Sequence, residues 1–183
     1  MPFVEYGIAM ERKLEIAKFH ARCLGRLLPA DPEDRDMPPI PLQAHFEAAG
    51  RAVASIPDQL ASGIVVSIGD AVPCLPRENA AYLQKVVEKL PKSDIREVLQ
   101  GFVDDPRYCD LRSWRNRATH RFDRKRSRGG QWFVEPPDGC KEAIKPRDVA
   151  NYTQALIDFG AGIVQQIGTI EELAVALRDR YTE

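Results

Sequence analysis

The apolar residues in the C-terminal part of the chain follow a helical repeat. Between Val149 and Leu177 they recur at alternating intervals of three and four residues, and Gln166 is the one interruption. A helix with 3.6 residues per turn places residues at this spacing on one face. A second stripe with the same spacing runs from Leu42 to Leu60, and the alternation typical of strands is nearly absent. We therefore predict an all-α protein whose long helices bury these stripes.

Interruptions of the periodicity set the expected helix boundaries. A Pro-rich, acidic segment at 29–41 is typical of a loop, and a segment at 128–145 containing Gly and Pro is expected to be a loop or a small hairpin. Helices are expected at about 4–28, 42–70, 77–90, 93–103, 105–127 and from 146 onwards. Short connections favour antiparallel neighbours, so the chain of 183 residues is predicted to form one antiparallel bundle of about five helices.

Three local signals refine these boundaries. Pro57 removes a backbone donor and is expected to kink the second helix. Asp105-Pro106 is typical of a helix start, with the aspartate as the cap and the proline in the first turn. Thr169 and Glu172 have the spacing of a capping box. We therefore expect the last helix to bend or restart near Gly168.

The composition excludes several classes of protein. The longest apolar stretch, around Ile64–Ile68, is far shorter than the roughly 20 residues of a membrane span. The first residues lack the apolar core of a signal peptide. No two of the four cysteines form the close pair of a zinc or redox site. They are Cys23, Cys74, Cys109 and Cys140. We expect a cytoplasmic protein with reduced thiols, no membrane span, no metal site and no cofactor.

Positive charge is concentrated in residues 112–128, which we call the basic segment. The segment has eight basic side chains and one acid, Asp123, hence a net charge of +7 in a chain whose total is −1. The basic residues are Arg112, Arg115, Arg117, Arg121, Arg124, Lys125, Arg126 and Arg128. Clustered arginines are typical of phosphate binding. The alternative is a solvated helix face paired with acids of a neighbouring helix.

His120 is one of three histidines and lies inside the basic segment. Cationic neighbours disfavour the protonated imidazole and so lower the pKa of a histidine. Such a side chain is largely neutral at neutral pH yet can still transfer protons. A nearby arginine can hold a phosphate and stabilise charge in the transition state. His20 and His45 each stand alone in helical segments, so we predict structural or surface roles for both.

The residues RNRATH, 115–120, fit the R-N-x-x-x-H pattern of the HEPN superfamily of ribonucleases and nucleic-acid-associated helical domains. The helix order also resembles that family, because the motif follows a long helix pair and precedes a loop and a final helix. The resemblance implies a single HEPN-like domain over 1–183 that acts as a homodimeric, metal-independent endoribonuclease. Arg115 and His120 match the catalytic pair of the family, and Asn116 matches the polar residue after the arginine.

The resemblance also implies partners. RNA would bind the remaining basic residues, namely Arg112, Arg117, Arg121, Arg124, Lys125, Arg126 and Arg128. Many members are toxins of toxin–antitoxin or antiphage systems, so a nucleotidyltransferase-type antitoxin is a candidate partner.

Helix geometry favours a dimer independently of the resemblance. Arg115 and His120 project about 140° apart on one helix, whereas Asn116 and His120 share a face. Two such helices across a twofold axis could bring arginine and histidine to one phosphate. Trp114 is expected to pack in the core, and Trp132 to pack against the bundle rather than stack on a base.

Two other interpretations of the motif stay open. A helical dimer could use the basic segment to bind RNA or an acidic partner without cleaving anything. The motif could also be coincidental in an ordinary helical scaffold.

Overall fold

A computed structural model describes residues 2–28, 40–112 and 148–182, and these residues contain helices and no strand. The all-α prediction is therefore confirmed for the described residues. The helices are α1 (Pro2–Leu27), α2 (Ile40–Ala54), α3 (Ile56–Ile68), the 3₁₀-helix η2 (Glu78–Ala80), α4 (Leu83–Lys89), α5 (Asp94–Val103), α7 (Val149–Gln165) and α8 (Ile167–Thr182). A further helix begins at residue 106 and is described to residue 112.

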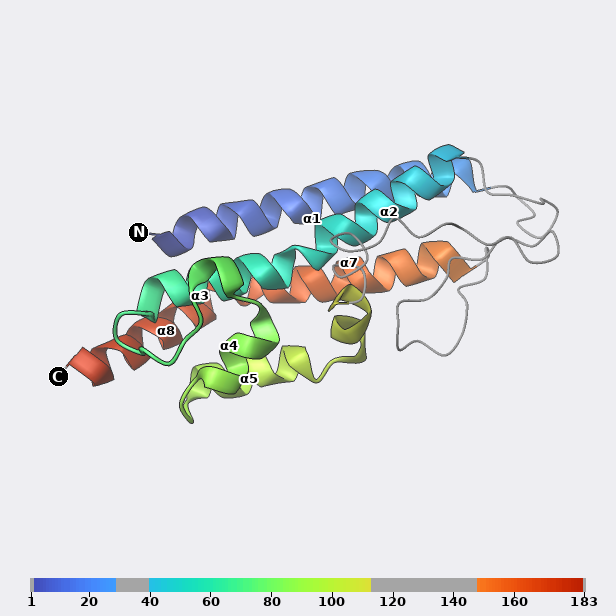
Figure 1. Cartoon of the computed structure of the whole chain (residues 1–183). Helices are drawn as coiled ribbons and strands as arrows, with labels where there is room; N and C mark the ends of the chain where they lie inside the picture. The colour runs from blue at the N-terminus through green and yellow to red at the C-terminus, as the bar shows by residue number, and fades with distance from the viewer. Residues whose placement is uncertain (1, 29–39, 113–147, 183) are drawn as a thin grey trace.

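The long helices lie along one another and share one apolar core. α1 runs antiparallel to the α2–α3 pair and to the α7–α8 pair (Figure 1). The short helices α4 and α5 pack against α3 and α8 on the side of the bundle away from α1 (Figure 1). The largest fully buried side chains come from α1 to α5, and the predicted α7–α8 stripe contributes Val149, Phe159, Ile163 and Ile170 to the same core.

At the expected kink near Pro57 the helix is interrupted at one residue, Ser55, which separates two helices. α2 ends at Ala54, and α3 begins at Ile56 with Pro57 in its first turn. Pro57 has no N–H to donate to the preceding turn, so the helix cannot continue unchanged through this position. At the break the Ser55 hydroxyl donates a hydrogen bond to the Ala52 carbonyl oxygen at 2.7 Å.

Two glycines allow helices to approach this region closely. A Cβ atom on Gly160 of α7 would lie 3.0 Å from both Val53 Cγ1 and Ile56 Cδ1, on either side of the α2–α3 break. A Cβ atom on Gly63 of α3 would lie 3.2 Å from Tyr6 Cβ of α1. Both distances are shorter than ordinary van der Waals contact. The glycines therefore set how near α7 and α1 lie to the central helices.

The predicted helix boundaries agree with the structure for α1, for α5 and for the start of α2, and they differ for the predicted helix at 77–90. α1 and α5 agree with the prediction within two residues. The predicted helix at 77–90 is shorter, because Ala81 and Tyr82 have extended backbones between η2 and α4. The predicted end of the loop at 29–41 agrees with the structure to within two residues, since α2 begins at Ile40. The rest of that loop, 29–39, and the predicted loop or hairpin at 128–145 lie outside the described residues.

The last helix restarts near Gly168 as predicted, but the predicted capping box is wrong. α7 ends at Gln165 and α8 begins at Ile167. The Ile170 N–H donates to the Gln166 carbonyl oxygen at 2.9 Å. Thr169 is therefore already inside the first turn of α8 and does not cap it.

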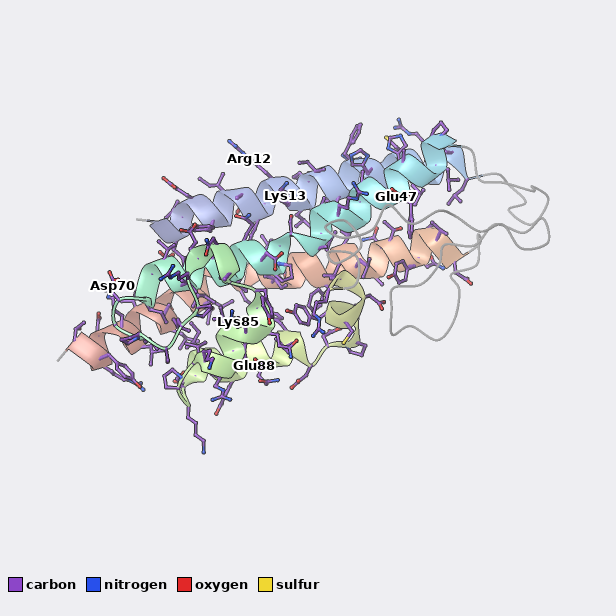
Figure 2. The ribbon with its side chains drawn as sticks, viewed as in Figure 1. Arg12, Lys13, Glu47, Asp70, Lys85 and Glu88 are labelled. Carbon is purple, nitrogen blue, oxygen red and sulfur yellow. The ribbon has the colours of Figure 1, made fainter. Side chains whose placement is uncertain are left out.

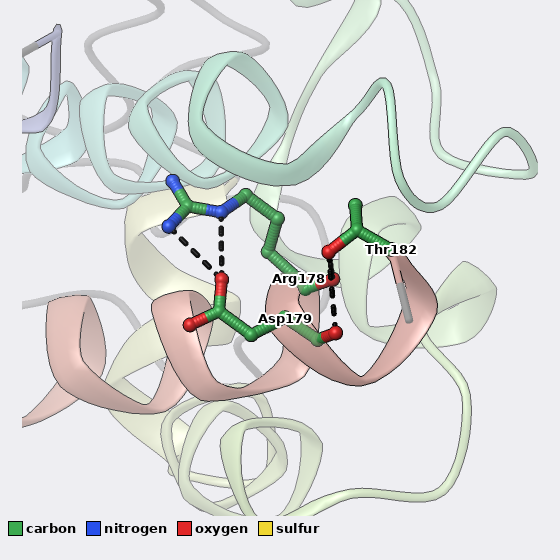
Figure 3. Close-up of polar contacts among 3 residues, drawn as sticks. All are labelled: Arg178, Asp179 and Thr182. Carbon is green, nitrogen blue, oxygen red and sulfur yellow. Dashed lines mark hydrogen bonds and ion pairs between the residues drawn. The ribbon is translucent and has the colours of Figure 1, made fainter.

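Polar contacts stabilise two exposed parts of the bundle, the connection between α3 and α4 and the C-terminal end of α8. The Tyr6 hydroxyl donates a hydrogen bond to the Glu78 carboxylate, and this bond raises the pKa of Tyr6 to about 12. The contact ties the connection between α3 and α4 to α1. At the end of α8, Thr182 Oγ1 donates to the carbonyl oxygens of Arg178 and Asp179, at 3.3 and 3.2 Å (Figure 3). The single hydroxyl proton is thus shared between two carbonyl oxygens of the last turns of α8.

The predictions about the cysteines and about a membrane span can be compared with the described residues. Cys23, Cys74 and Cys109 carry free thiols, and Cys140 lies outside the described residues. No helix described in the structure has the length and apolar character required to cross a membrane.

Candidate functional site: the helix that leads into the basic segment

The helix that leads into the basic segment begins as predicted at Asp105-Pro106. The Arg107 N–H donates to Asp105 Oδ1 at 2.9 Å, and the Tyr108 N–H donates to the Asp105 carbonyl oxygen at 2.9 Å. Asp105 therefore satisfies backbone donors that the first turn of a helix leaves free. The Arg107 guanidinium also binds this carboxylate in a bidentate manner, with Nη2 2.6 Å from Oδ2 and Nε 2.9 Å from Oδ1.

The two charges at this helix start stabilise each other. The hydrogen bond from the Arg107 side chain holds the pKa of Asp105 below its usual value, against the opposing effect of burial. The same bond raises the pKa of Arg107. Both shifts favour the charged forms, so the pair stays ionised at neutral pH. The helix start therefore keeps its charged cap at neutral pH.

The first turns of this helix are anchored to the bundle. Tyr108 and Leu111 are buried. The Tyr108 hydroxyl accepts a hydrogen bond from the Gln84 backbone N–H of α4 at 3.1 Å. On the other side, the Arg107 guanidinium lies 5.2 Å from the ring centroid of Phe159 in α7. Contacts with two helices thus fix the base from which the chain enters the basic segment.

Arg112 is the first residue of the basic segment and the one that the structure describes. Its side chain is exposed, and Nη1 donates a hydrogen bond to the Gln84 side-chain oxygen of α4. The other predicted site residues lie outside the described residues. These are Arg115, Asn116, Arg117, His120, Arg121, Arg124, Lys125, Arg126 and Arg128, together with Trp114 and Trp132. The juxtaposition of Arg115 and His120 stays a prediction.

A cleft of about 430 Å³ lies beside the start of this helix, between α5 and α7. Its charged lining consists of three carboxylates and one guanidinium, from Glu97, Asp105, Asp158 and Arg107. An excess of negative charge repels phosphate. The cleft is therefore a poor site for a phosphate-bearing ligand.

His20 of α1 and His45 of α2 form a pair that sequence reasoning missed. Their Nδ1 atoms lie 2.8 Å apart, so one imidazole donates and the other accepts. Burial lowers the pKa of His20, and the electrostatic effect of the neighbouring His45 lowers it further. The sequence contained one indication of this pair. His20 and His45 lie a few residues before and after the connection between the first two predicted helices, so antiparallel packing of these helices would bring them near each other. Their helix faces could not be judged from two isolated histidines.

We expect the stability of the protein to fall as the pH is lowered through this histidine pair. A histidine whose pKa is lower in the folded state binds more protons when unfolded, so its contribution is present above about pH 6.5 and is lost as the pH falls toward the folded pKa. Urea unfolding at several pH values between 5 and 7.5 measures this effect, which is expected to be about 1 kcal/mol. The variant with His20→Gln and His45→Gln is expected to lose this pH dependence, while His120→Gln retains it. Equal slopes in all three proteins would contradict the assignment.

No group of three or more His, Cys, Asp or Glu side chains that could hold a metal ion occurs within residues 2–28, 40–112 and 148–182. Comparison of the chain with protein-family models, with curated proteins and with solved structures finds no match.

Proposed function

We propose that the protein is a HEPN-type endoribonuclease that cleaves RNA without a metal ion. The observation that carries the proposal is the motif Arg115-Asn116-x-x-x-His120 within a segment of charge +7 in a chain whose total charge is −1. Clustered arginines bind phosphate, and a histidine among them can transfer protons near neutral pH. The motif and the charge thus coincide in the same seventeen residues, 112–128.

The anchoring of the preceding helix supports this proposal. Catalytic groups must be held close to their productive geometry, which requires a rigid support. Tyr108 and Leu111 are buried in the bundle, and the Asp105–Arg107 pair caps the helix. The motif begins four residues after Leu111. A firmly seated helix start is thus available next to the proposed catalytic residues.

In the proposed reaction, the 2′-hydroxyl of the substrate attacks the adjacent phosphorus. The nucleophile is already tethered to the substrate, so the enzyme needs to supply proton transfer and charge stabilisation. As the bond from the 2′-oxygen to phosphorus forms, the bond from phosphorus to the 5′-oxygen breaks. His120 from one or both copies takes the proton of the 2′-hydroxyl or gives a proton to the leaving 5′-oxygen. Arg115 neutralises the charge that develops on the phosphoryl oxygens. On a regular helix Asn116 would lie on the same face as His120.

The proposed catalytic unit is a homodimer of HEPN-like domains, each an antiparallel helical bundle. Arg115 and His120 diverge by about 140° on a regular helix, so one copy does not readily bring both to the same phosphate. Two copies related by a twofold axis complete the site. A toxin role and a nucleotidyltransferase-type antitoxin belong to the same proposal.

The purified protein tests this function directly. Incubated with RNA and EDTA, it is expected to produce fragments with 2′,3′-cyclic phosphate and 5′-hydroxyl ends at the same rate as without EDTA. Mass spectrometry of the fragment ends identifies the chemistry. Loss of cleavage in EDTA would overturn the metal-independent mechanism. Binding without cleavage under all conditions would favour the non-catalytic RNA-binding dimer.

RNA affinity is expected to fall steeply as the salt concentration rises, because bound arginines release counterions from the phosphates. The variant with Arg124→Glu and Arg126→Glu is expected to bind more weakly and with a flatter salt dependence. Fluorescence anisotropy at several salt concentrations measures both quantities. The variant with Arg178→Glu and Arg180→Glu, at the exposed end of α8, is the matched control and keeps the wild-type slope. A slope unchanged by the first variant would place the RNA footprint elsewhere.

A further inference from the structure

The outer face of α1 exposes an unusual share of apolar surface. α1 packs against α2, α3 and α7 with its inner side and lies at one edge of the bundle (Figure 1). Val4, Ile8, Ile16, Phe19 and Leu27 of α1 are among the eight large apolar side chains that are exposed within the described residues. Ile8 is 46% exposed and Phe19 is 52% exposed. Apolar side chains gathered on one helix face are typical of an interaction surface.

The charges on this face have an ordered arrangement. Ile8, Arg12, Glu15 and Phe19 follow one another at intervals of four, three and four residues, which is the spacing of a seam along a helix. Figure 2 shows the Arg12 side chain pointing away from the rest of the bundle. Ile8 and Phe19 project within about 20° of each other and lie about 16 Å apart along the helix axis. The seam therefore has an apolar residue near each end and two opposite charges between them.

We propose that this face binds a second copy of the chain, with the two α1 helices antiparallel. A twofold axis level with Lys13 and Leu14 brings Ile8 of one copy opposite Phe19 of the other. The same axis brings Arg12 opposite Glu15 and Glu5 opposite Arg22. Within the seam, each charge then faces an opposite charge and Ile8 faces Phe19, whereas Val4, Ile16 and Leu27 lie off the seam. A parallel arrangement opposes like charges and is disfavoured.

The Phe19 ring is held in position for this contact. It lies edge-on to the His20 ring, with 5.3 Å between the ring centroids, and His20 in turn is bonded to His45 of α2. The ring therefore stands on a fixed support while half of it is exposed. A side chain that is already ordered loses little conformational freedom when a partner covers it.

The α1 contact does not rest on the proposed function. The helix at 106–112, which leads to the motif, lies on the opposite side of the bundle from α1 (Figure 1). Where the α1 contact and the catalytic dimer both form and their twofold axes intersect at right angles, four copies assemble. Disruption of the α1 contact then halves the mass and leaves RNA cleavage per chain unchanged, whereas a failed cleavage assay says nothing against the α1 contact.

Disulfide trapping between differently tagged copies tests the register. The four native cysteines are replaced by serine in the full chain, and Ile8→Cys and Phe19→Cys are prepared separately. A disulfide requires Cα atoms about 4.4–6.8 Å apart. After oxidation we expect a cross-linked product in the mixture and little in either variant alone, because identical positions lie about 16 Å apart along the axis. Ile8→Cys mixed with Val175→Cys, at an exposed position of α8, is the control and stays uncrosslinked. Absence of the mixed product, or equal cross-linking in all samples, would overturn the proposal.

Light scattering provides a second readout that does not depend on cysteine chemistry. Phe19→Glu places a carboxylate at the end of the seam and is expected to halve the mass found for the wild type. Val66→Glu, at an exposed apolar position of α3, is the matched control and keeps the wild-type mass. Circular dichroism of both variants checks that the helices are retained. A monomeric wild type at about 50 μM, or a mass unaffected by Phe19→Glu, would show that α1 does not bind a second copy.

Discussion

Replacement of His120 by alanine is expected to slow RNA cleavage by a factor of about 10² to 10⁴, which is the usual contribution of a general acid or base. RNA affinity is expected to stay within about twofold of the wild type, because phosphate-binding arginines supply most of the binding energy. Arg115→Ala is expected to lower the rate by about 10² to 10³ through loss of transition-state charge stabilisation. Single-turnover cleavage and anisotropy measure the two quantities separately.

Matched variants distinguish chemistry from folding in this experiment. His20→Ala removes a histidine of the bundle, and Arg180→Ala removes an exposed arginine of α8. Both are expected to cleave at close to the wild-type rate. In a bacterial host, toxic expression of the wild type together with normal growth for His120→Ala would show the same dependence in cells. A His120→Ala variant that cleaves as fast as the wild type would exclude the proposed catalytic role.

A single 2′-deoxy substitution at the cut position is expected to abolish cleavage there. The 2′-hydroxyl is the nucleophile of the proposed reaction, and no water at ordinary concentration matches a tethered group with an effective molarity of about 10⁵ M or more. Binding is expected to be nearly unchanged, because phosphates rather than 2′-hydroxyls contact the basic segment. Gel analysis of end-labelled substrates gives the cleavage rate, and anisotropy gives the affinity.

The control substrate carries the deoxy substitution two nucleotides away from the cut position. This RNA is expected to be cut at the normal rate, which separates the loss of the nucleophile from a general effect of the sugar. Cleavage of the first substrate at an undiminished rate would mean that water or a protein group attacks the phosphorus. In that case the roles given to Arg115 and His120 would need to be reassigned to a hydrolytic reaction.

Local sequence signals predicted much of the secondary structure. Periodic apolar spacing gave the all-α class and the helix at 94–103. Pro57 marked the break between α2 and α3, and Asp105-Pro106 marked the start of the next helix. The last two features depend on a few consecutive residues. Pro57 lacks a backbone N–H, and the Asp105 side chain caps the helix that follows it. They can therefore be inferred without knowledge of the rest of the chain.

The predictions that failed rested on local sequence signals, and tertiary packing overrode these signals. Residues 77–90 contain enough helix-forming residues for one helix, yet Ala81 is buried and the backbone at 81–82 is extended. Thr169 is a residue type that often caps helices, but α8 begins at Ile167, two residues before it. Helix propensity differs by less than about 1 kcal/mol between most residues, so burial of a side chain such as Ile170 readily shifts a helix end.

For the candidate site, the sequence by itself determined which residues to propose. The order Arg-Asn-x-x-x-His and the concentration of charge at 112–128 are properties of consecutive residues. Only the tertiary structure decided how the support of that segment is built, through the Tyr108–Gln84 hydrogen bond and the Arg107–Phe159 contact. It also decided that the two histidines outside the segment form a pair 2.8 Å apart. The physical reason is that such contacts depend on the rotation and stagger of helices distant in sequence, which the spacing of residues within one helix does not define.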